Sequence, residues 1–170
     1  MNVSLIKTIQ EDIKVNNNLR LKILLILFRI LQKTTTKGIV LRLIFFPLEL
    51  LYRFYSEIIL NIELRPKTKI SFGLRIDHGF GIVVNQNAII GSYCHLRHGV
   101  TIGCKMREDG SELPSPILGD NIEIGCNASV IGDIKIGNNT TIGVGSVVLE
   151  DIQANHIAIG NPAFFRKKKS

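Results

Sequence analysis

Two histidines in the middle of the chain are of the residue type that acid–base chemistry near neutral pH requires. His78 follows Asp77 in the stretch LRIDHGFGIVV, and His98 lies in the later stretch RHGVTIG. A histidine can take a proton from a hydroxyl at neutral pH, and a carboxylate on its other ring nitrogen fixes its tautomer. Whether the two histidines act together depends on the elements that hold them.

From Ile70 onward an aliphatic residue recurs every six positions, with one shift of two residues before Val84. The positions in phase are Ile70, Ile76, Val84, Ile90, Leu96, Ile102, Leu118, Ile124, Val130, Ile136, Ile142 and Val148. This period predicts a solenoid of hexapeptide repeats, in which three short strands and their turns close one triangular coil. We therefore expect a mainly β fold, a parallel β-helix of about four coils over residues 70–150.

The six-residue register gives the two histidines equivalent positions on adjacent coils. His78 lies two residues after Ile76, and His98 lies two residues after Leu96. We expect them to stack at about the strand spacing of ~4.8 Å. The inserted residues, at GIVV (81–84), should bulge the corner beside His78. Two stacked histidines beside a bulge favour a catalytic site over a solvated turn.

The nearby carboxylates are not equivalent as partners for His78. Asp77 adjoins it but should point to the opposite face, so Glu63, just before the first coil, is predicted to orient the base. Cys126 and Val144 should continue the histidine column. His95 and His156 lack comparable support and are predicted to be surface residues.

The segments around the repeat have a different character. Residues 103–116 (GCKMREDGSELPSP) interrupt it and are a candidate functional loop. Residues 1–62 predict helices, with an amphipathic basic helix at 19–33, a break at 34–38 and a second helix at 39–61, bent at Pro47. Their apolar faces must be buried in the protein, against another subunit or on a membrane surface.

Composition limits the classes of function. The net charge is +7, and residues 1–62 hold nine Lys or Arg against four Asp or Glu, which favours anionic partners such as a phosphorylated cofactor or lipid head groups. No nucleic-acid-binding module is recognisable. No apolar run reaches the roughly 18 residues of a membrane span, and the start lacks a signal-peptide pattern. The three cysteines have no metal or redox spacing. We therefore expect a cytoplasmic protein.

Four stretches together resemble a known family: IDHGFGIVVNQNAIIG, RHGVTIG, LGDNIEIGCNASVIGDIKIGNNTTIGVGSVV and AIGNPAFFRK. Over about residues 61–167 the chain resembles the serine acetyltransferase family of left-handed β-helix acyltransferases, most closely its branch in capsule and exopolysaccharide gene clusters. The resemblance implies an acetyl-CoA-dependent O-acetyltransferase and a homotrimer with each active site between adjacent subunits. It divides the chain into a helical segment (1–62), a β-helix domain (63–160) and a basic tail (161–170).

The resemblance also implies roles for individual residues. His78 matches the catalytic base, Glu63 falls where the family has the orienting Asp, and Asp77 matches a residue on the acceptor side. His98 is assigned to the acceptor, with a second catalytic residue as the alternative. The motif GNPA (160–163) matches a segment near coenzyme A. The residues assigned to coenzyme A are Gly103, Gly125, Asn127, Ala128, Gly143, Gly145, Arg166 and Lys167. The basic residues of this set either meet the phosphates or belong to a solvated tail.

Departures from the family pattern bear on the acceptor. Ser115 stands before Pro116 where serine acetyltransferases have a second active-site histidine, and apolar and basic residues replace the long helical domain. These differences favour a sugar hydroxyl of a capsular or exopolysaccharide, or its precursor, over free serine. Serine O-acetylation for cysteine synthesis is the alternative. The amino-terminal helices are expected to join subunits into a higher oligomer or to rest on the inner face of the membrane.

A metal site is the remaining alternative from another class, because left-handed solenoids can hold zinc between subunits through three histidines. His78, His95 and His98 would be the ligands. His95 and His98 lie on one coil with side-chain directions that do not converge easily, so no metal is expected.

Overall fold

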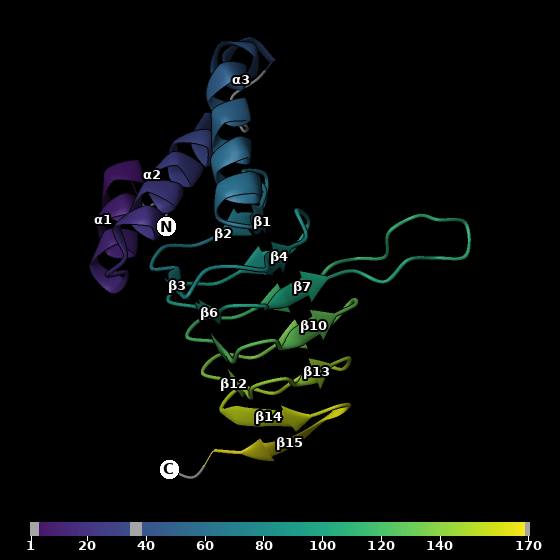
Figure 1. The fold of residues 1–170 in the computed structure, drawn as a ribbon. Coiled ribbons are helices and arrows are strands. Elements are labelled where there is room, and N and C mark those ends of the chain that lie inside the picture. The colour runs from purple at the N-terminus through teal and green to yellow at the C-terminus, as the bar shows by residue number, and fades with distance from the viewer. Residues whose placement is uncertain (1–3, 35–38, 169–170) are drawn as a thin grey trace.

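The computed structural model describes residues 4–34 and 39–168 and forms a three-sided stack of coils with helices at one end (Figure 1). The helices are α1 (Leu5–Val15), α2 (Leu19–Thr34) and α3 (Ile39–Arg53), which continues into a π-helical segment, η1 (Phe54–Ile59). The predicted break at 34–38 lies almost wholly outside the described residues. The second predicted helix runs through Pro47 as expected.

Three parallel sheets form the sides of the stack. The first contains β1 (Ile62–Leu64), β4 (Ile82–Val84), β7 (Thr101–Gly103), β10 (Ser129–Ile131) and β13 (Val147–Val148). The second contains β2 (Lys69–Ile70), β5 (Ile89–Ile90), β8 (Ile117–Leu118) and β11 (Lys135–Ile136). The third contains β3 (Arg75–Asp77), β6 (His95–Arg97), β9 (Glu123–Ile124), β12 (Thr141–Ile142) and β14 (His156–Gly160), with β15 (Ala163–Lys167) at its edge.

The register between strands confirms the six-residue repeat. In the third sheet, for example, Ile76 pairs with Leu96 and Leu96 with Ile124, and all three side chains are buried. The fold prediction is thus confirmed, but the stack has about five turns, not four. Leu64 lies six residues before Ile70, and Ala158 six residues after Ile152, and both are buried. The repeat therefore extends one strand beyond each end of the range read from the sequence.

The end of the chain pairs with the last coil. Residues 163–167, predicted as part of a basic tail, form β15, which pairs antiparallel with β14. The tight turn at Asn161–Pro162 reverses the chain, and the paired backbone groups hold the segment against the last coil. Only the end of the RKKK run, Lys169, lies outside the described residues.

Each of the three sheets has a free edge at the first coil, and side chains from a different helical element cap each edge. Asp12 and Asn16 of α1 bond the backbone of Leu74 and Ile76 beside and within β3. Arg29 and Gln32 of α2 donate to carbonyls around β2, including that of Ile70. Tyr52 and Ser56, on α3 and η1, donate to carbonyls of β1. The helices thereby satisfy backbone groups that would otherwise be unpaired at an open edge.

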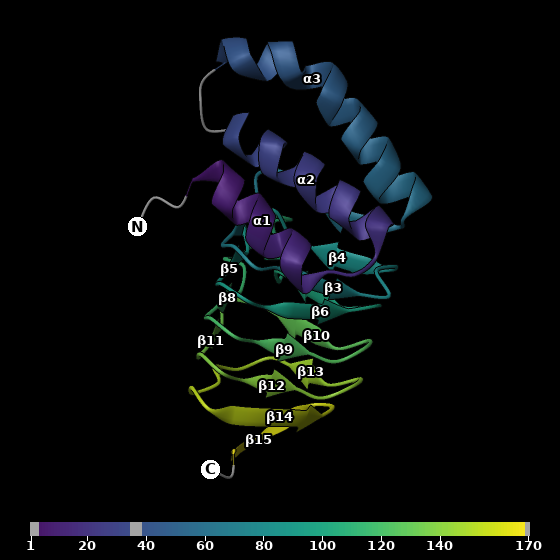
Figure 2. The ribbon, with the colours of Figure 1, turned by 90° about the vertical axis from the view of Figure 1, so that its left-hand side faces the viewer.

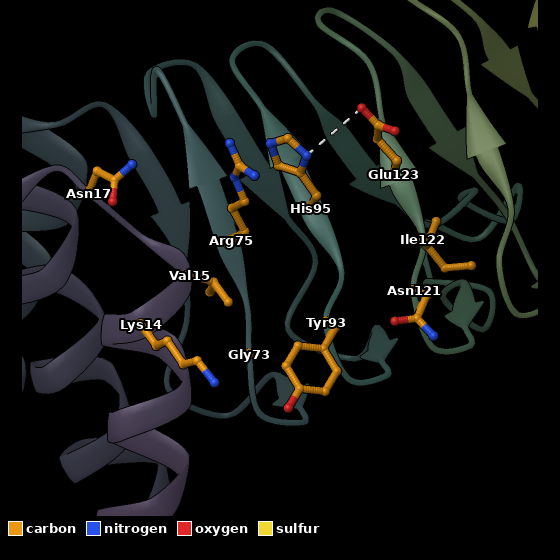
Figure 3. Close-up of a pocket in the computed structure, with 10 residues that line it drawn as sticks. All are labelled: Lys14, Val15, Asn17, Gly73, Arg75, Tyr93, His95, Asn121, Ile122 and Glu123. Atoms are coloured by element: carbon orange, nitrogen blue, oxygen red, sulfur yellow. Dashed lines mark ion pairs between the residues drawn. The ribbon is translucent and has the colours of Figure 1, made fainter.

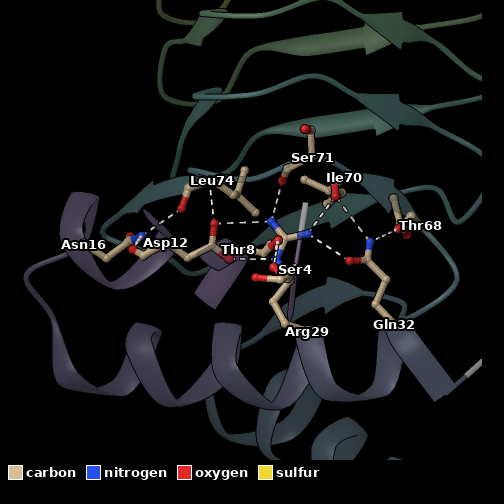
Figure 4. A network of polar contacts seen from close by, with 10 residues as sticks. All are labelled: Ser4, Thr8, Asp12, Asn16, Arg29, Gln32, Thr68, Ile70, Ser71 and Leu74. Atoms are coloured by element: carbon tan, nitrogen blue, oxygen red, sulfur yellow. Dashed lines mark hydrogen bonds and ion pairs between the residues drawn. The ribbon is translucent and has the colours of Figure 1, made fainter. Parts of the chain in front are cut away.

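A buried ion pair joins two of these caps (Figure 4). The Arg29 Nε atom lies 2.7 Å from Asp12 Oδ2, and both side chains are 1% exposed. The apolar face of α2 packs beside this pair, with Leu21, Leu24, Leu25, Phe28 and Leu31 buried. Burial of the helical segment within the protein, one of the expected outcomes, thus holds for α2.

The outer face of α3 is different. α3 is the outermost helix, and α2 lies between it and the β-helix (Figure 2). Large apolar side chains remain exposed along α3 and η1: Val40, Leu43, Ile44, Phe46, Leu50, Leu51, Phe54, Ile58 and Ile59. None of the helices in the described ranges is long and apolar enough to cross a membrane. A continuous apolar stripe of this size marks an interaction surface.

The predicted loop leaves the stack as a projecting arm between β7 and β8 (Figure 1). Backbone bonds from Leu113 to Lys105 and from Arg107 to Ser111 close it into a hairpin-like arm. At its base the Ser115 hydroxyl donates to the Asn85 side-chain oxygen over 3.0 Å, and Ser115 is buried. Ser115 therefore anchors the arm.

Candidate active site

His78 occupies the corner that follows β3, where the first coil carries two extra residues. If the pairing of β3 with β6 is extended forward, His78 lies opposite His98. If the pairing of β4 with β7 is extended backward, Phe80 lies opposite His98. The bulge is therefore at residues 78–80, just before the predicted site at 81–84. His78 is exposed and has a φ of 51°, an uncommon conformation for a bulky residue that recurs at functional sites.

Gly79 lets the chain turn at this point. A Cβ atom there would lie 2.8 Å from side-chain atoms of both Ile76 and Leu21 of α2. The backbone after His78 is therefore pressed into the core, and this holds the histidine outward at the corner.

The predicted pairing of the two histidines is present. The ring centroids of His78 and His98 are 6.2 Å apart, with the rings edge to face. Phe80 stacks on His98 at 5.0 Å, so the bulge adds an aromatic wall to the pair. Nδ1 of His98 is buried and has no hydrogen-bond partner among the described residues. Its other ring nitrogen, Nε2, is thus the one left for an external group.

The column continues along the stack as expected. The Asn127 backbone N–H bonds the His98 carbonyl, and the Gly145 N–H bonds the Cys126 carbonyl. Cys126 and Val144 therefore follow His98 on successive coils. The turn between β14 and β15, which carries the GNPA motif, lies one coil beyond Val144, because Ala158 pairs with Ile142.

Glu63 lies on β1, opposite Val83 of β4. Its carboxylate is 3.5 Å from Arg65, and it makes no hydrogen bond to His78 in the described structure. The bond between Gly81 N–H and the Asn61 carbonyl, 2.7 Å, holds the start of β1 against the end of the histidine corner. The role of Glu63 as the orienting carboxylate stays a prediction.

Asp77 belongs to an ionic network on the outward face of the third sheet, as its predicted direction implies. Its carboxylate accepts two hydrogen bonds from Arg75 and lies 2.8 Å from Nε2 of His95. Partial burial raises the pKa of Asp77, but the bond from Arg75 and the charges of His95 and Arg75 outweigh this effect and lower it. Asp77 therefore stays ionised and is not available to orient His78.

His95 is the residue of this network that sequence reasoning missed. Its side chain lies on the outward face of the sheet and is 14% exposed. Burial lowers the pKa of His95 and outweighs the opposing charge of Asp77. Because an ionised carboxylate only accepts hydrogen bonds, Nε2 of His95 carries the hydrogen and donates it to Asp77. The signal in the sequence was the pairing of Arg75, His95 and Glu123 at equivalent strand positions.

The residues assigned to coenzyme A fall into three places. Gly125, Asn127, Ala128, Gly143 and Gly145 line the corner beyond His98, and Gly103 lies at the end of β7. Ala128 is fully buried, so only its backbone can face a ligand. A Cβ atom on Gly145 would meet nothing within 4 Å. The backbone is therefore open at Gly145, which fits an extended pantetheine arm, whereas Gly125 and Gly143 pack closely against the next coil.

Arg166 and Lys167 lie apart from this corner. They pair with Ile157 and His156 at the far end of the hairpin from its turn. With Ile157 and Lys168 they line a pocket of about 500 Å³. Three cations around one pocket fit phosphate groups.

The histidine column runs from His78 on the first coil to the turn between β14 and β15 on the last. It spans four steps of ~4.8 Å, roughly 19 Å, a length suited to an extended cofactor.

No group of three or more His, Cys, Asp or Glu side chains is placed to hold a metal ion within the ranges that the structure describes. His95 is turned to the outward sheet face with Asp77, away from the His78–His98 pair. The three histidines considered as zinc ligands therefore do not converge within one chain.

Comparison with known proteins gives the family. No family model matches the chain. It is 38% identical over 107 residues to a serine acetyltransferase of Synechococcus elongatus, covering 63% of this chain and 43% of that protein. It is 33% identical over 117 residues to the putative colanic acid biosynthesis acetyltransferase WcaB of Escherichia coli, covering 69% of this chain and 70% of WcaB. The chain belongs to the serine acetyltransferase family.

The fold agrees with that of the family. A serine acetyltransferase solved in complex with CoA superimposes with a TM-score of 0.72 and 25% identity, over 88% of this chain and 58% of that one. The left-handed β-helix of hexapeptide repeats is thus a shared feature. This member of the family spans less than half the length of the Synechococcus protein.

Proposed function

We propose that the protein transfers an acetyl group from acetyl-CoA to a sugar hydroxyl of a capsular or exopolysaccharide, or of its precursor. The observation that carries the proposal is the exposed His78 at a bulged corner, paired with His98 at the head of a column of small residues. Membership of an acetyltransferase family supports the reaction type. The WcaB match, which covers 70% of that protein, supports the polysaccharide branch.

The chemistry follows from one base. Acetyl-CoA supplies the acetyl group as a thioester. His78 takes the proton of the acceptor hydroxyl as the oxygen attacks the carbonyl carbon, so that a C–O bond forms and the C–S bond breaks. His78 then returns the proton to the departing thiolate. Backbone amides along the corner are the donors proposed for the developing oxyanion. No covalent enzyme intermediate is needed.

Ser115 bears on the identity of the acceptor. This residue is bonded to Asn85 at the base of the arm, where serine acetyltransferases have a second active-site histidine. Because the histidine that serine acetyltransferases have at this position is missing, the site favours an acceptor other than serine, held by other contacts. Serine O-acetylation is the second candidate, favoured by the names of several relatives.

Steady-state kinetics separate the two acceptors. The rate is measured as release of the coenzyme A thiol. The kcat/KM should be at least tenfold higher with an oligosaccharide acceptor than with L-serine. A comparable or higher kcat/KM with L-serine would replace the sugar proposal by serine O-acetylation.

Glu63→Gln tests the proposed orienting carboxylate. Loss of the negative charge should lower kcat several-fold, less than removal of the base, with little change in KM, because Gln keeps the shape but not the charge that stabilises the protonated imidazole. The pH profile of kcat should also shift. Glu150→Gln, an exposed carboxylate after β13, serves as the matched control. An unchanged kcat and profile in Glu63→Gln would mean that another group orients His78.

We further propose that the protein acts in the cytoplasm as a homotrimer, with the apolar stripe of α3 and η1 covered in a larger assembly or at the inner face of the membrane. Replacing Leu43, Leu50 and Phe54 together by Gln should leave folding intact, because all three are about half exposed or more. Each replacement removes roughly 1–3 kcal/mol of burial on association.

Light scattering and sedimentation with phosphatidylglycerol vesicles measure these two outcomes. The triple variant should lose the larger assembly or at least tenfold in vesicle affinity, whereas Ile6→Gln, an exposed apolar residue of α1, should change neither. An unchanged triple variant in both measurements would contradict a role for the stripe.

A further inference from the structure

A pocket of about 470 Å³ lies between the end of α1 and the outward face of the third sheet, where β3, β6 and β9 begin (Figure 3). Lys14 comes from α1, and Arg75, Tyr93, His95, Asn121 and Glu123 come from three successive coils. Figure 3 shows the side chains of Lys14, Tyr93 and His95 around one open space. None of these residues has a role in the acetyl transfer described above.

Tyr93 stands where the coil favours asparagine or glycine. Successive coils pair Gly73, Tyr93, Asn121, Asn139 and Asn155 at one corner, and all five have φ between 55° and 76°. Neighbouring asparagines bond one another over 3.2 Å along this ladder. Asn and Gly adopt such φ values at little cost, whereas an aromatic residue does not. A tyrosine at this one position is therefore an exception that calls for a role other than the turn.

The tyrosine ring is held in place by its neighbours. Phe72 packs against it edge to face at 5.2 Å, and its hydroxyl bonds Glu11 of α1 over 3.1 Å. A Cβ atom on Gly73 would lie 2.4 Å from the ring, so glycine is needed there to seat it. The side chain still remains 42% exposed. A fixed, half-exposed ring is a ready surface for the apolar face of a sugar.

The polar side chains of the pocket are fixed as well. His95 lies 2.8 Å from Asp77 and 3.9 Å from Glu123, and Arg97 bonds Glu123 over 3.1 Å. Arg75 is bonded through Nε and one Nη atom to Asp77. Such charged groups, held by one another, present donors and acceptors in fixed directions, as hydroxyl recognition requires.

The pocket and the base lie at opposite ends of the same strands. Arg75 and His78 are three residues apart on one strand and its corner, roughly 10 Å at 3.3 Å per residue. Tyr93 lies five residues before His98, roughly 17 Å at the same rise per residue. Both spans exceed one sugar ring, so a group lying on Tyr93 would be separate from the sugar at His78. Asp77, between them, joins both places.

We propose that this pocket is a glycan-binding subsite that holds the sugars next to the one acetylated, so that the natural acceptor is an oligosaccharide or longer chain. The inference rests on the proposed function and adds the length of the acceptor to it. Tyr93 supplies the stacking surface, and Arg75, His95 and Glu123 bond the hydroxyls.

Tyr93→Asn is the sharpest test, because it restores the asparagine ladder and so should preserve the fold. Acetyl transfer is measured with a monosaccharide acceptor and with a tetrasaccharide of the same sugar. The variant should raise KM for the tetrasaccharide about tenfold more than KM for the monosaccharide, as expected for loss of one aromatic stacking contact. Asn139→Gly, on the same corner two coils away, should leave both KM values unchanged. Equal changes for the two acceptors would overturn the subsite.

Direct binding keeps the inference testable if no sugar is acetylated, a result that would refute the proposed function and not the subsite. Saturation-transfer NMR with cellotetraose, chitotetraose and a hyaluronan tetrasaccharide should show contact with the wild-type protein that Tyr93→Asn reduces at least fivefold. No transfer to any of the three, or equal transfer in the variant, would overturn the inference.

Discussion

Replacing His78 by alanine should lower kcat for acetyl transfer by roughly 10²–10⁴, because the acceptor hydroxyl then has no base to take its proton. KM should change little, since the ring is needed in the transition state more than for binding. The side chain is exposed at its corner, and the turn is set by Gly79. The variant should therefore fold and melt like the wild type.

His156→Ala is the matched control for this change. His156 lies at the other end of the stack, and its Nδ1 atom is 2.9 Å from the Ala154 carbonyl. Its removal should leave kcat within about twofold of the wild type. A His78→Ala enzyme with near-wild-type turnover would show that another group takes the proton.

Replacing Arg29 by alanine should lower the free energy of unfolding by about 3–5 kcal/mol, because it leaves the Asp12 carboxylate buried without its counter-ion. The guanidinium also donates to the Ile70 and Ser71 carbonyls at the edge of the second sheet, and these two hydrogen bonds are lost as well. The first coil and α1 should loosen together, because Asp12 also bonds the Leu74 N–H.

Urea unfolding measures this effect, with Arg53→Ala as the control. The Arg53–Glu57 pair is largely exposed, and exposed pairs contribute only about 0–1 kcal/mol. If the two variants lost the same small amount of stability, the edge caps would not hold the helices on the coil.

The β-helix could be predicted almost entirely from the sequence, because every coil needs an aliphatic residue at the same positions to fill its core. Ile76, Leu96 and Ile124 have equivalent burial because they have equivalent neighbours. The position of His98 over His78 follows from the same register. The number of coils was underestimated because Leu64 precedes Arg65 and Pro66, which break the apparent pattern while the backbone continues it.

What the sequence did not reveal depends on contacts between segments far apart. The capping of β2 and β3 by Arg29 and Asp12 joins residues more than 40 positions apart and has no period to detect. The displacement of the bulge to residues 78–80 depends on how Gly79 packs under Leu21. The role proposed for Tyr93 was not predicted for another reason. Tyr93 differs from the Asn and Gly residues at its corner, and this difference appears only when the corner residues of successive coils are aligned.

The contacts of Glu63 could not be predicted from its position in the sequence. That position predicts that Glu63 orients His78, yet in the single chain its carboxylate lies beside Arg65. Asp77, the sequence neighbour, was correctly set aside, because its bonds go to Arg75 and His95.

The most direct test of the account is the mass of the acceptor after incubation with acetyl-CoA. The purified protein is mixed with acetyl-CoA, a panel of capsular oligosaccharides and L-serine, beside the His78→Ala variant. The account predicts that an oligosaccharide gains the mass of one acetyl group with the wild type and not with the variant. Acetylated serine as the main product, or an acetylated sugar formed equally by His78→Ala, would contradict it.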